Sequence, residues 1–209
     1  MSISGRPADW QVLFDGTSTD GFRRYGGDGF PADRWVVDGE ALRTIPGGAA
    51  DLITRGAWAD FELEFEWRVA PGGNSGVLYR VRESSAPAWA SGPEYQVLDD
   101  ERHPDGDRPE TSAGALYDLI APVDGTRPEP VGSFNTARIV VRGGTVEHWL
   151  NGLRVVEYRW DDPALRERIA ASKFAGAPDF MRQATGHVVL QHHGEEAWFR
   201  AVRIRPLDS

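Results

Sequence analysis

The sequence predicts a single all-β domain spanning residues 1–209, a sandwich of two β-sheets with one short helix. Short runs of alternating apolar and polar residues recur along the chain, separated by Gly, Pro, Asn or Asp at roughly 8 to 12 residues. Only one segment carries helical start signals. No linker, composition shift or internal repeat divides the chain, so its length fits one large β domain.

The expected strands are short, and turn residues bound most of them. Asp38-Gly39 and Asn151-Gly152 are typical of tight hairpin turns. Asp162-Pro163 predicts an N-cap and a first-turn proline, which places the helix at 164–172. The expected strands, about a dozen in number, are 10–14, 35–37, 40–43, 51–54, 61–69, 74–82, 92–100, 114–119, 134–142, 145–150, 153–158, 186–193 and 197–206.

Strand 61–69 has the clearest alternation, because its apolar residues are interleaved with Glu62, Glu64, Glu66 and Arg68. Paired carboxylates of a glycosidase are one explanation of this charged row. A sheet face exposed to solvent is the favoured explanation, since the row is unbroken and includes an arginine.

Composition excludes several classes of function. The net charge of −9 leaves no basic surface for nucleic acid. No run of 18 or more apolar residues exists, so we expect no membrane span. The absence of cysteine excludes disulfides and thiolate chemistry. Residues 1–7 have no apolar signal-peptide core, so we expect a cytoplasmic location. Nothing in the sequence favours a particular oligomeric state.

Polar residues on three expected strands point to a site. Glu94 and Gln96 share one strand face about 7 Å apart, a spacing that suits a polyhydroxylated ligand or a solvated strand. Gln191 and His193 likewise share a face. Gly76 removes a side chain where another group needs to approach the backbone closely.

Seven segments in order resemble the 3-keto-disaccharide hydrolase family, over about 10–207. They are residues 13–16, 74–80, 94–100, 113–118, 134–135, 148–152 and 190–194. The resemblance implies a jelly-roll sandwich like that of concanavalin A. It also implies cleavage of glycosides whose glucose ring carries a ketone at carbon 3, with a small carbohydrate as the partner. Two alternatives stay open on the same fold: a carbohydrate-binding module and, ranked last, a laminarinase-type glucanase.

The implied chemistry needs a base for the carbon-2 proton, a donor or cation at the ketone oxygen, and an acid for the leaving group. Glu94 and His193 are the candidate bases, and Arg80 is the candidate for the ketone. A plain Arg80–Glu94 ion pair is an equally good explanation of those two residues. A divalent metal at the ketone stays open, because no ligand spacing is specific for it.

The expected substrate-binding residues share only a polar side chain and a position in or beside these motifs. They are Gln96, Asp118, Gln191, His148, Asn74 and Tyr117. For Asp118 we expect a pairing with Arg80 or a histidine, and a core position is the alternative for His148.

Overall fold

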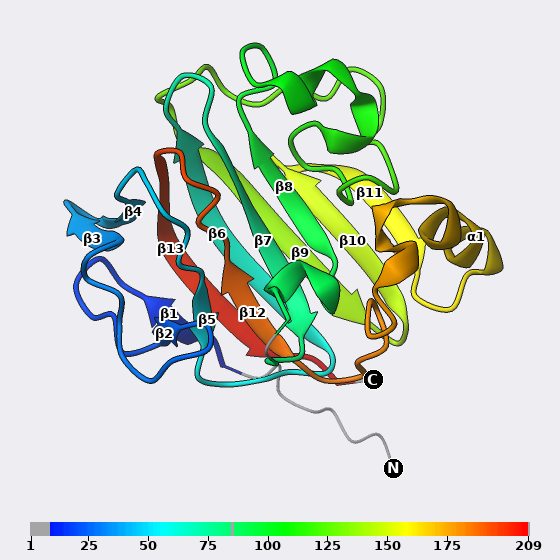
Figure 1. The fold of residues 1–209 in the computed structure, drawn as a ribbon, viewed down its shortest axis with the longest axis horizontal. Helices are drawn as coiled ribbons and strands as arrows, with labels where there is room; N and C mark the ends of the chain where they lie inside the picture. The colour runs from blue at the N-terminus through cyan, green and yellow to red at the C-terminus, as the bar shows by residue number, and fades with distance from the viewer. Residues whose placement is uncertain (1–8, 85, 209) are drawn as a thin grey trace.

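The computed structural model describes residues 9–84 and 86–208, which form two packed antiparallel sheets (Figure 1). The strands are β1 (Gln11–Phe14), β2 (Phe22–Arg24), β3 (Trp35–Asp38), β4 (Ala41–Thr44), β5 (Leu52–Thr54), β6 (Phe61–Val69), β7 (Asn74–Val81), β8 (Glu94–Leu98), β9 (Asn135–Arg142), β10 (Thr145–Leu150), β11 (Leu153–Arg159), β12 (His187–Leu190) and β13 (Ala197–Pro206). The helices are α1 (Pro163–Ala171) and the 3-10 turns η1 (Ala88–Ala90), η2 (Pro104–Asp107), η3 (Pro109–Thr111) and η4 (Lys173–Gly176). The predicted all-β sandwich with one α-helix is confirmed.

The eight-stranded sheet has the order β11-β10-β9-β6-β13-β4-β3, and β1 pairs with β13. The five-stranded sheet has the order β2-β5-β12-β7-β8. Several neighbouring strands lie far apart in the sequence, such as β6 and β13 in one sheet and β5 and β12 in the other, as in a jelly roll. In Figure 1 the η1 turn lies over the five-stranded sheet, and the η2–η3 and η4 segments lie beside its β8 edge.

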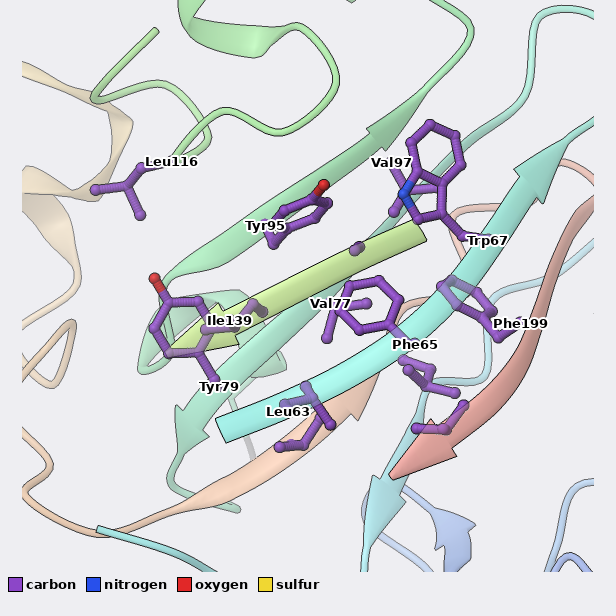
Figure 2. Packing of buried hydrophobic residues seen from close by; sticks show 14 of the residues in the cluster. Leu63, Phe65, Trp67, Val77, Tyr79, Tyr95, Val97, Leu116, Ile139 and Phe199 are labelled. Atoms are coloured by element: carbon purple, nitrogen blue, oxygen red, sulfur yellow. The ribbon is translucent and has the colours of Figure 1, made fainter. Parts of the chain in front are cut away.

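The core lies between the sheets and is rich in aromatic residues. Phe65 of β6 packs edge-to-face on Tyr95 of β8, with ring centroids 5.5 Å apart (Figure 2). Phe199 of β13 contacts Phe65 from the same sheet at 6.4 Å. Each of these three side chains is at most 2% exposed. The alternation of β6 thus places its apolar row in the core, as its sequence predicts.

The charged row of β6 lies on the opposite side of the eight-stranded sheet and forms ion pairs across it. Arg205 of β13 pairs with Glu62, Arg203 pairs with Glu64, and Arg200 pairs with Glu66. A row of carboxylates that is matched one-to-one by arginines supports the interpretation as a solvent-facing sheet surface.

The prediction of a strand at 114–119 is wrong. This segment is bound to the edge of β8 by Gly114 N–H to Gln96 O (2.9 Å) and an isolated bridge between Leu116 and Tyr95. Gly114 (φ 84°) and Asp118 (φ 60°) have left-handed backbone conformations that interrupt regular pairing. The short β2 and the four 3-10 turns were not predicted.

No helix in the described part of the chain is both long enough and apolar enough to cross a membrane. The stretch 1–7, on which the expectation of a cytoplasmic location rests, lies outside the described residues.

We expect Phe65→Ala to lower the free energy of unfolding by roughly 3 to 5 kcal/mol, because it leaves a cavity between the sheets. Urea denaturation measures this loss. Val12→Ala is the control, since Val12 is 62% exposed and should cost far less. A loss below about 1 kcal/mol for Phe65→Ala would contradict the packing described.

Candidate functional site

The outer face of the five-stranded sheet, turned away from the other sheet, carries the candidate site. Tyr95 and Val97 of β8 belong to the core between the sheets. Strand alternation therefore directs Glu94 and Gln96 to the outer face. The pairings Val189–Ile53, Val189–Leu78 and Leu78–Glu94 align one row of residues across β5, β12, β7 and β8.

The neighbouring row on this face is polar. Gly76 of β7 pairs with Gln96 of β8, and the N–H of Gln191 donates to the carbonyl of Gly76 at 2.9 Å. Continuing the register of β12 and β5 places Asp51 beside Gln191. Among the described residues, Oε1 of Gln191 is buried and has no hydrogen-bond partner. This row therefore holds a carboxamide oxygen that is free to bind a ligand.

Gly76 makes room for the carboxyl group of Glu94. A Cβ at position 76 would lie 2.2 Å from Oε1 of Glu94 and 2.7 Å from its Cδ. This close approach confirms the reason expected for glycine at this position. Glu94 is only 6% exposed, and no described residue donates a hydrogen bond to its carboxyl group.

Burial raises the pKa of Glu94 to about 8, because the ionised form loses its hydration. Lys173 opposes this shift, whereas the negative charges of Asp51 and Asp105 add to it. The pKa of Asp51 is also raised by burial, although its carboxylate accepts the N–H of His192 at 2.8 Å. A carboxyl group that changes protonation near neutral pH is suited to proton transfer.

Tyr117 and Lys173 border Glu94. The N–H of Tyr117 donates to the carbonyl of Glu94 at 3.1 Å, and its hydroxyl donates to Oδ2 of Asp105 at 3.2 Å. The ammonium group of Lys173 lies 4.1 Å from the centroid of the Tyr117 ring. Tyr117 therefore lies beside the polar row.

A second polar group lies just beyond β12. Nδ1 of His193 donates to Oε2 of Glu195 at 2.8 Å, and the rings of His193 and His103 are 6.2 Å apart. Nε2 of His103 lies 3.4 Å from the amide of the buried Asn74. The structure thus brings His193 and Asn74 together at the end of the sheet, near Gln191.

His103, His193 and Glu195 have possible ligand atoms within 4.8 Å of one another, which makes them a candidate metal site. Nδ1 of His103 accepts the N–H of Asp105 at 3.1 Å, which places the ring proton on Nε2. A metal-bound imidazole needs a bare nitrogen toward the ion and its proton on the other nitrogen. His103 presents the opposite arrangement, so this group fits a metal ion poorly.

Arg80 lies away from Glu94, contrary to expectation. A bulge in β7 opposes Tyr79 and Arg80 to the single residue Val188, and Arg80 has φ 49°. Its guanidinium donates to Ala59 O at 2.8 Å and pairs with Asp60 at 3.1 Å. Neither the ketone role nor the alternative ion pair with Glu94 fits this position.

His148 is part of the core, and this position does not fit the predicted contact with substrate. It is fully buried, its Nδ1 donates to Gly114 O, and its Nε2 accepts the hydroxyl of Tyr79 at 2.8 Å. Burial lowers the pKa of His148 to about 4, so the ring stays neutral. The core alternative describes it correctly.

Gln96 and Asp118 hold loops. The fully buried Gln96 donates through Nε2 to Thr111 O at 3.1 Å, which ties the η3 turn to β8. Asp118 pairs with Arg108 at 2.7 Å, where we expected Arg80 or a histidine. Both residues border the site through the loop that they anchor.

Sequence reasoning missed Asp51, His103, Asp105 and Lys173. His103 and Asp105 belong to a segment that reads only as a polar loop. Lys173 carries a usable signal, because it is the only lysine in the chain.

A cavity of about 840 Å³ lies against the C-terminal end of β8. Trp67, Leu98, Asp100 and the loop 122–131 line it, and Glu94 does not. The carboxyl group of Asp100 accepts the N–H of Ala113 at 2.8 Å, so the Asp99-Asp100 pair acts as a loop cap.

Comparison with known proteins gives a consistent result. Residues 9–205 match the model of the 3-keto-alpha-glucoside-1,2-lyase-like domain. A 3-keto-disaccharide hydrolase of Bacteroides thetaiotaomicron is 33% identical, over 94% of this chain and 78% of its own length. A candidate glycosyl hydrolase of Parabacteroides distasonis has a TM-score of 0.87 and 27% identity, over 95% of this chain and 94% of its own. A second such protein from that organism has a TM-score of 0.75 at 21% identity, over 95% and 100%, which shows the fold alone.

We expect Glu94→Gln to remove part of the pH dependence of stability. Because the pKa of Glu94 is about 8 in the folded state and an exposed glutamate has a pKa of 4.5, the wild type loses stability as pH rises between these values. The loss is on the order of 1 kcal/mol per pH unit. Urea denaturation at pH 5 and pH 8 measures it. Glu167→Gln on α1 is the exposed control, and an equal pH dependence in all three proteins contradicts the burial of an uncompensated carboxyl group.

Gly76→Ala should destabilise the protein by roughly 1 to 3 kcal/mol, because the added methyl group overlaps the carboxyl group of Glu94. Adding Glu94→Ala should recover much of this loss, which a double-mutant cycle measures. Gly29→Ala is the control, since nothing lies within 4 Å of a Cβ there. Additive effects of the two site substitutions would show that the methyl group and the carboxyl group do not meet.

Proposed function

The chain belongs to the family of 3-keto-alpha-glucoside-1,2-lyase-like domains, and we propose that it cleaves 3-keto-glycosides by elimination. The proposed substrate is a small carbohydrate, a 3-keto-disaccharide, as the name of the B. thetaiotaomicron relative suggests. Burial of the Glu94 carboxyl group, with its pKa of about 8, is the observation that carries the proposal.

The reaction follows from the ketone. A base removes the proton on carbon 2, and the electron pair of that C–H bond forms an enolate with the carbonyl at carbon 3. The enolate then re-forms the ketone as the double bond between carbons 1 and 2 forms and the bond from carbon 1 to the leaving oxygen breaks. An acid protonates that oxygen, and water that adds to the double bond gives free 3-keto-glucose. This series of reaction steps needs no nucleophilic carboxylate.

Glu94 is the proposed base. No residue in the described part of the chain donates a hydrogen bond that would favour its ionised form, so its buried carboxylate is a stronger base than an exposed one. Glu94 and His193 were both candidates from the sequence. We favour Glu94 because His193 is exposed and its Nδ1 is bonded to Glu195.

The polar residues around Glu94 supply donors for the ketone and the hydroxyl groups. The proton on Nε2 of His103 requires an acceptor, which Asn74 provides when its Oδ1 faces His103. The amide nitrogen of Asn74 is then free to donate to the sugar. The buried Oε1 of Gln191 has no hydrogen-bond partner among the described residues and can accept a hydrogen bond from a sugar hydroxyl. We assign the ketone to the amide nitrogen of Asn74 in place of Arg80.

The two alternative functions differ in what they require. A binding module needs only groups that hold the sugar, and it does not require a carboxyl group whose pKa is raised to about 8. A laminarinase-type glucanase needs two carboxyl groups about 5 to 5.5 Å apart, and the carboxylates of β6 are each paired with arginine. The elimination mechanism uses Glu94 directly.

We expect the purified protein to cleave 3-keto-trehalose or 3-keto-sucrose and to leave the unoxidised parent sugars intact. NMR in heavy water should show deuterium entering at carbon 2. The value of kcat/KM should rise with pH up to about 8 and then level off, because only ionised Glu94 accepts the proton.

Glu94→Gln should lower turnover by at least about 100-fold, the low end of general-base effects, and sugar binding should remain measurable. Gln191→Ala should weaken binding while carbon-2 exchange persists. Absence of reaction with every keto sugar, with and without added divalent metal, would favour the binding module. Cleavage without exchange at carbon 2 would exclude Glu94 as the base proposed.

A further inference from the structure

Trp89 is the most exposed of the eight tryptophans, at 40%. It lies on η1, which is fixed to the outer face of the five-stranded sheet. Its neighbour Ala88 is buried there in a cluster with Leu78 and Val81. The carbonyl of Ser91 accepts the N–H of Met181 at 2.9 Å, which joins η1 to the segment after η4. An exposed indole is thus held on a well-anchored turn.

Lys173 joins Trp89 to Tyr117. Its ammonium group lies 5.8 Å from the Trp89 ring centroid and 4.1 Å from that of Tyr117. The adjacent Phe174 is buried and stacks on Phe180 at 4.0 Å, which fixes the position of η4. The ammonium group is itself exposed, so its hydrogen-bond donors can reach a ligand.

These three residues continue directly from the base. Tyr117 is hydrogen-bonded through its backbone to Glu94, and Lys173 is the cation that acts on the Glu94 carboxyl group. Exposure increases from Glu94, which is buried, through the half-buried Tyr117 to Trp89. A ligand with its reacting carbon at Glu94 would therefore extend toward Trp89.

We propose that Trp89, Tyr117 and Lys173 form a subsite for the leaving group of the glycoside, and that this group is a second pyranose ring. The apolar face of a pyranose stacks on an indole ring, and the ammonium group donates to the sugar hydroxyls. Lysine suits this position as a compact group with three rotatable donors, whereas the other basic residues of the chain are arginines. The proposal rests on the proposed function, because it takes the reacting carbon to lie at Glu94.

The test compares two ligands that differ only in the leaving group, 3-keto-trehalose and methyl 3-keto-α-glucoside. Calorimetric titration uses Glu94→Gln as the background, so that neither ligand is consumed. Adding Trp89→Ala should weaken binding of the disaccharide about five- to tenfold, the size of one aromatic stacking contact. Binding of the methyl glycoside should stay unchanged. The affinity of the Trp89→Phe variant for the disaccharide should lie between that of the Glu94→Gln background and that of the Trp89→Ala variant. Lys173→Gln should also weaken only the disaccharide.

Leu153→Ala is the control, since Leu153 is 50% exposed on β11 of the other sheet. Circular dichroism and thermal melts establish that each variant is folded. Equal weakening of both ligands by Trp89→Ala, or no weakening of either, would overturn the subsite. Because the titration needs no turnover, failure of wild-type cleavage counts against the proposed function, whereas the difference between the two ligands decides the subsite.

Discussion

The alternation of β8 is the constraint on which the site depends. Tyr95 and Val97 fill the core against the eight-stranded sheet, so Glu94 and Gln96 must face the other way. That outer face is not left to solvent. The η1 turn lies over it and the η2–η3 and η4 segments border its β8 edge (Figure 1), and Gln96 ties the η3 turn to β8. The outer face of β8 would otherwise be exposed to solvent, but here it carries a buried carboxyl group. The surrounding loops supply further polar residues.

Burial of Glu94 has a cost that the fold does not offset with an ion pair. Glycine at 76 leaves space for the carboxyl group but offers it no donor, and Asp51 and Asp105 disfavour its charge. The protein instead holds the group mostly protonated near neutral pH, where ionisation is still within reach. On the outer face of the eight-stranded sheet, by contrast, Glu62, Glu64 and Glu66 each form an ion pair with an arginine. This contrast separates the proposed acid–base residue from carboxylates that form ion pairs.

Much of the site was accessible from the sequence because strand alternation is local. Glu94, Gly76, Gln191 and the neighbourhood of His193 follow from a period of two. Arg80 was misplaced because one bulge reverses the alternation, and Val81 consequently joins the outer cluster with Leu78. His148 was misplaced because the period of two separates two faces without saying which one is the core.

The sequence by itself determined the two-sheet class, most strand positions, the helix after Asp162 and the family to which the chain belongs, because turn residues and periodic patterns act over a few residues. Only the tertiary structure decided which strands pair and which loops cover the site. Lys173 and Asp105 act on Glu94, and His103 reaches His193, from segments that have no strand periodicity, so their positions depend on packing between distant segments. The raised pKa of Glu94 is likewise a tertiary property, since desolvation requires the whole assembly around it.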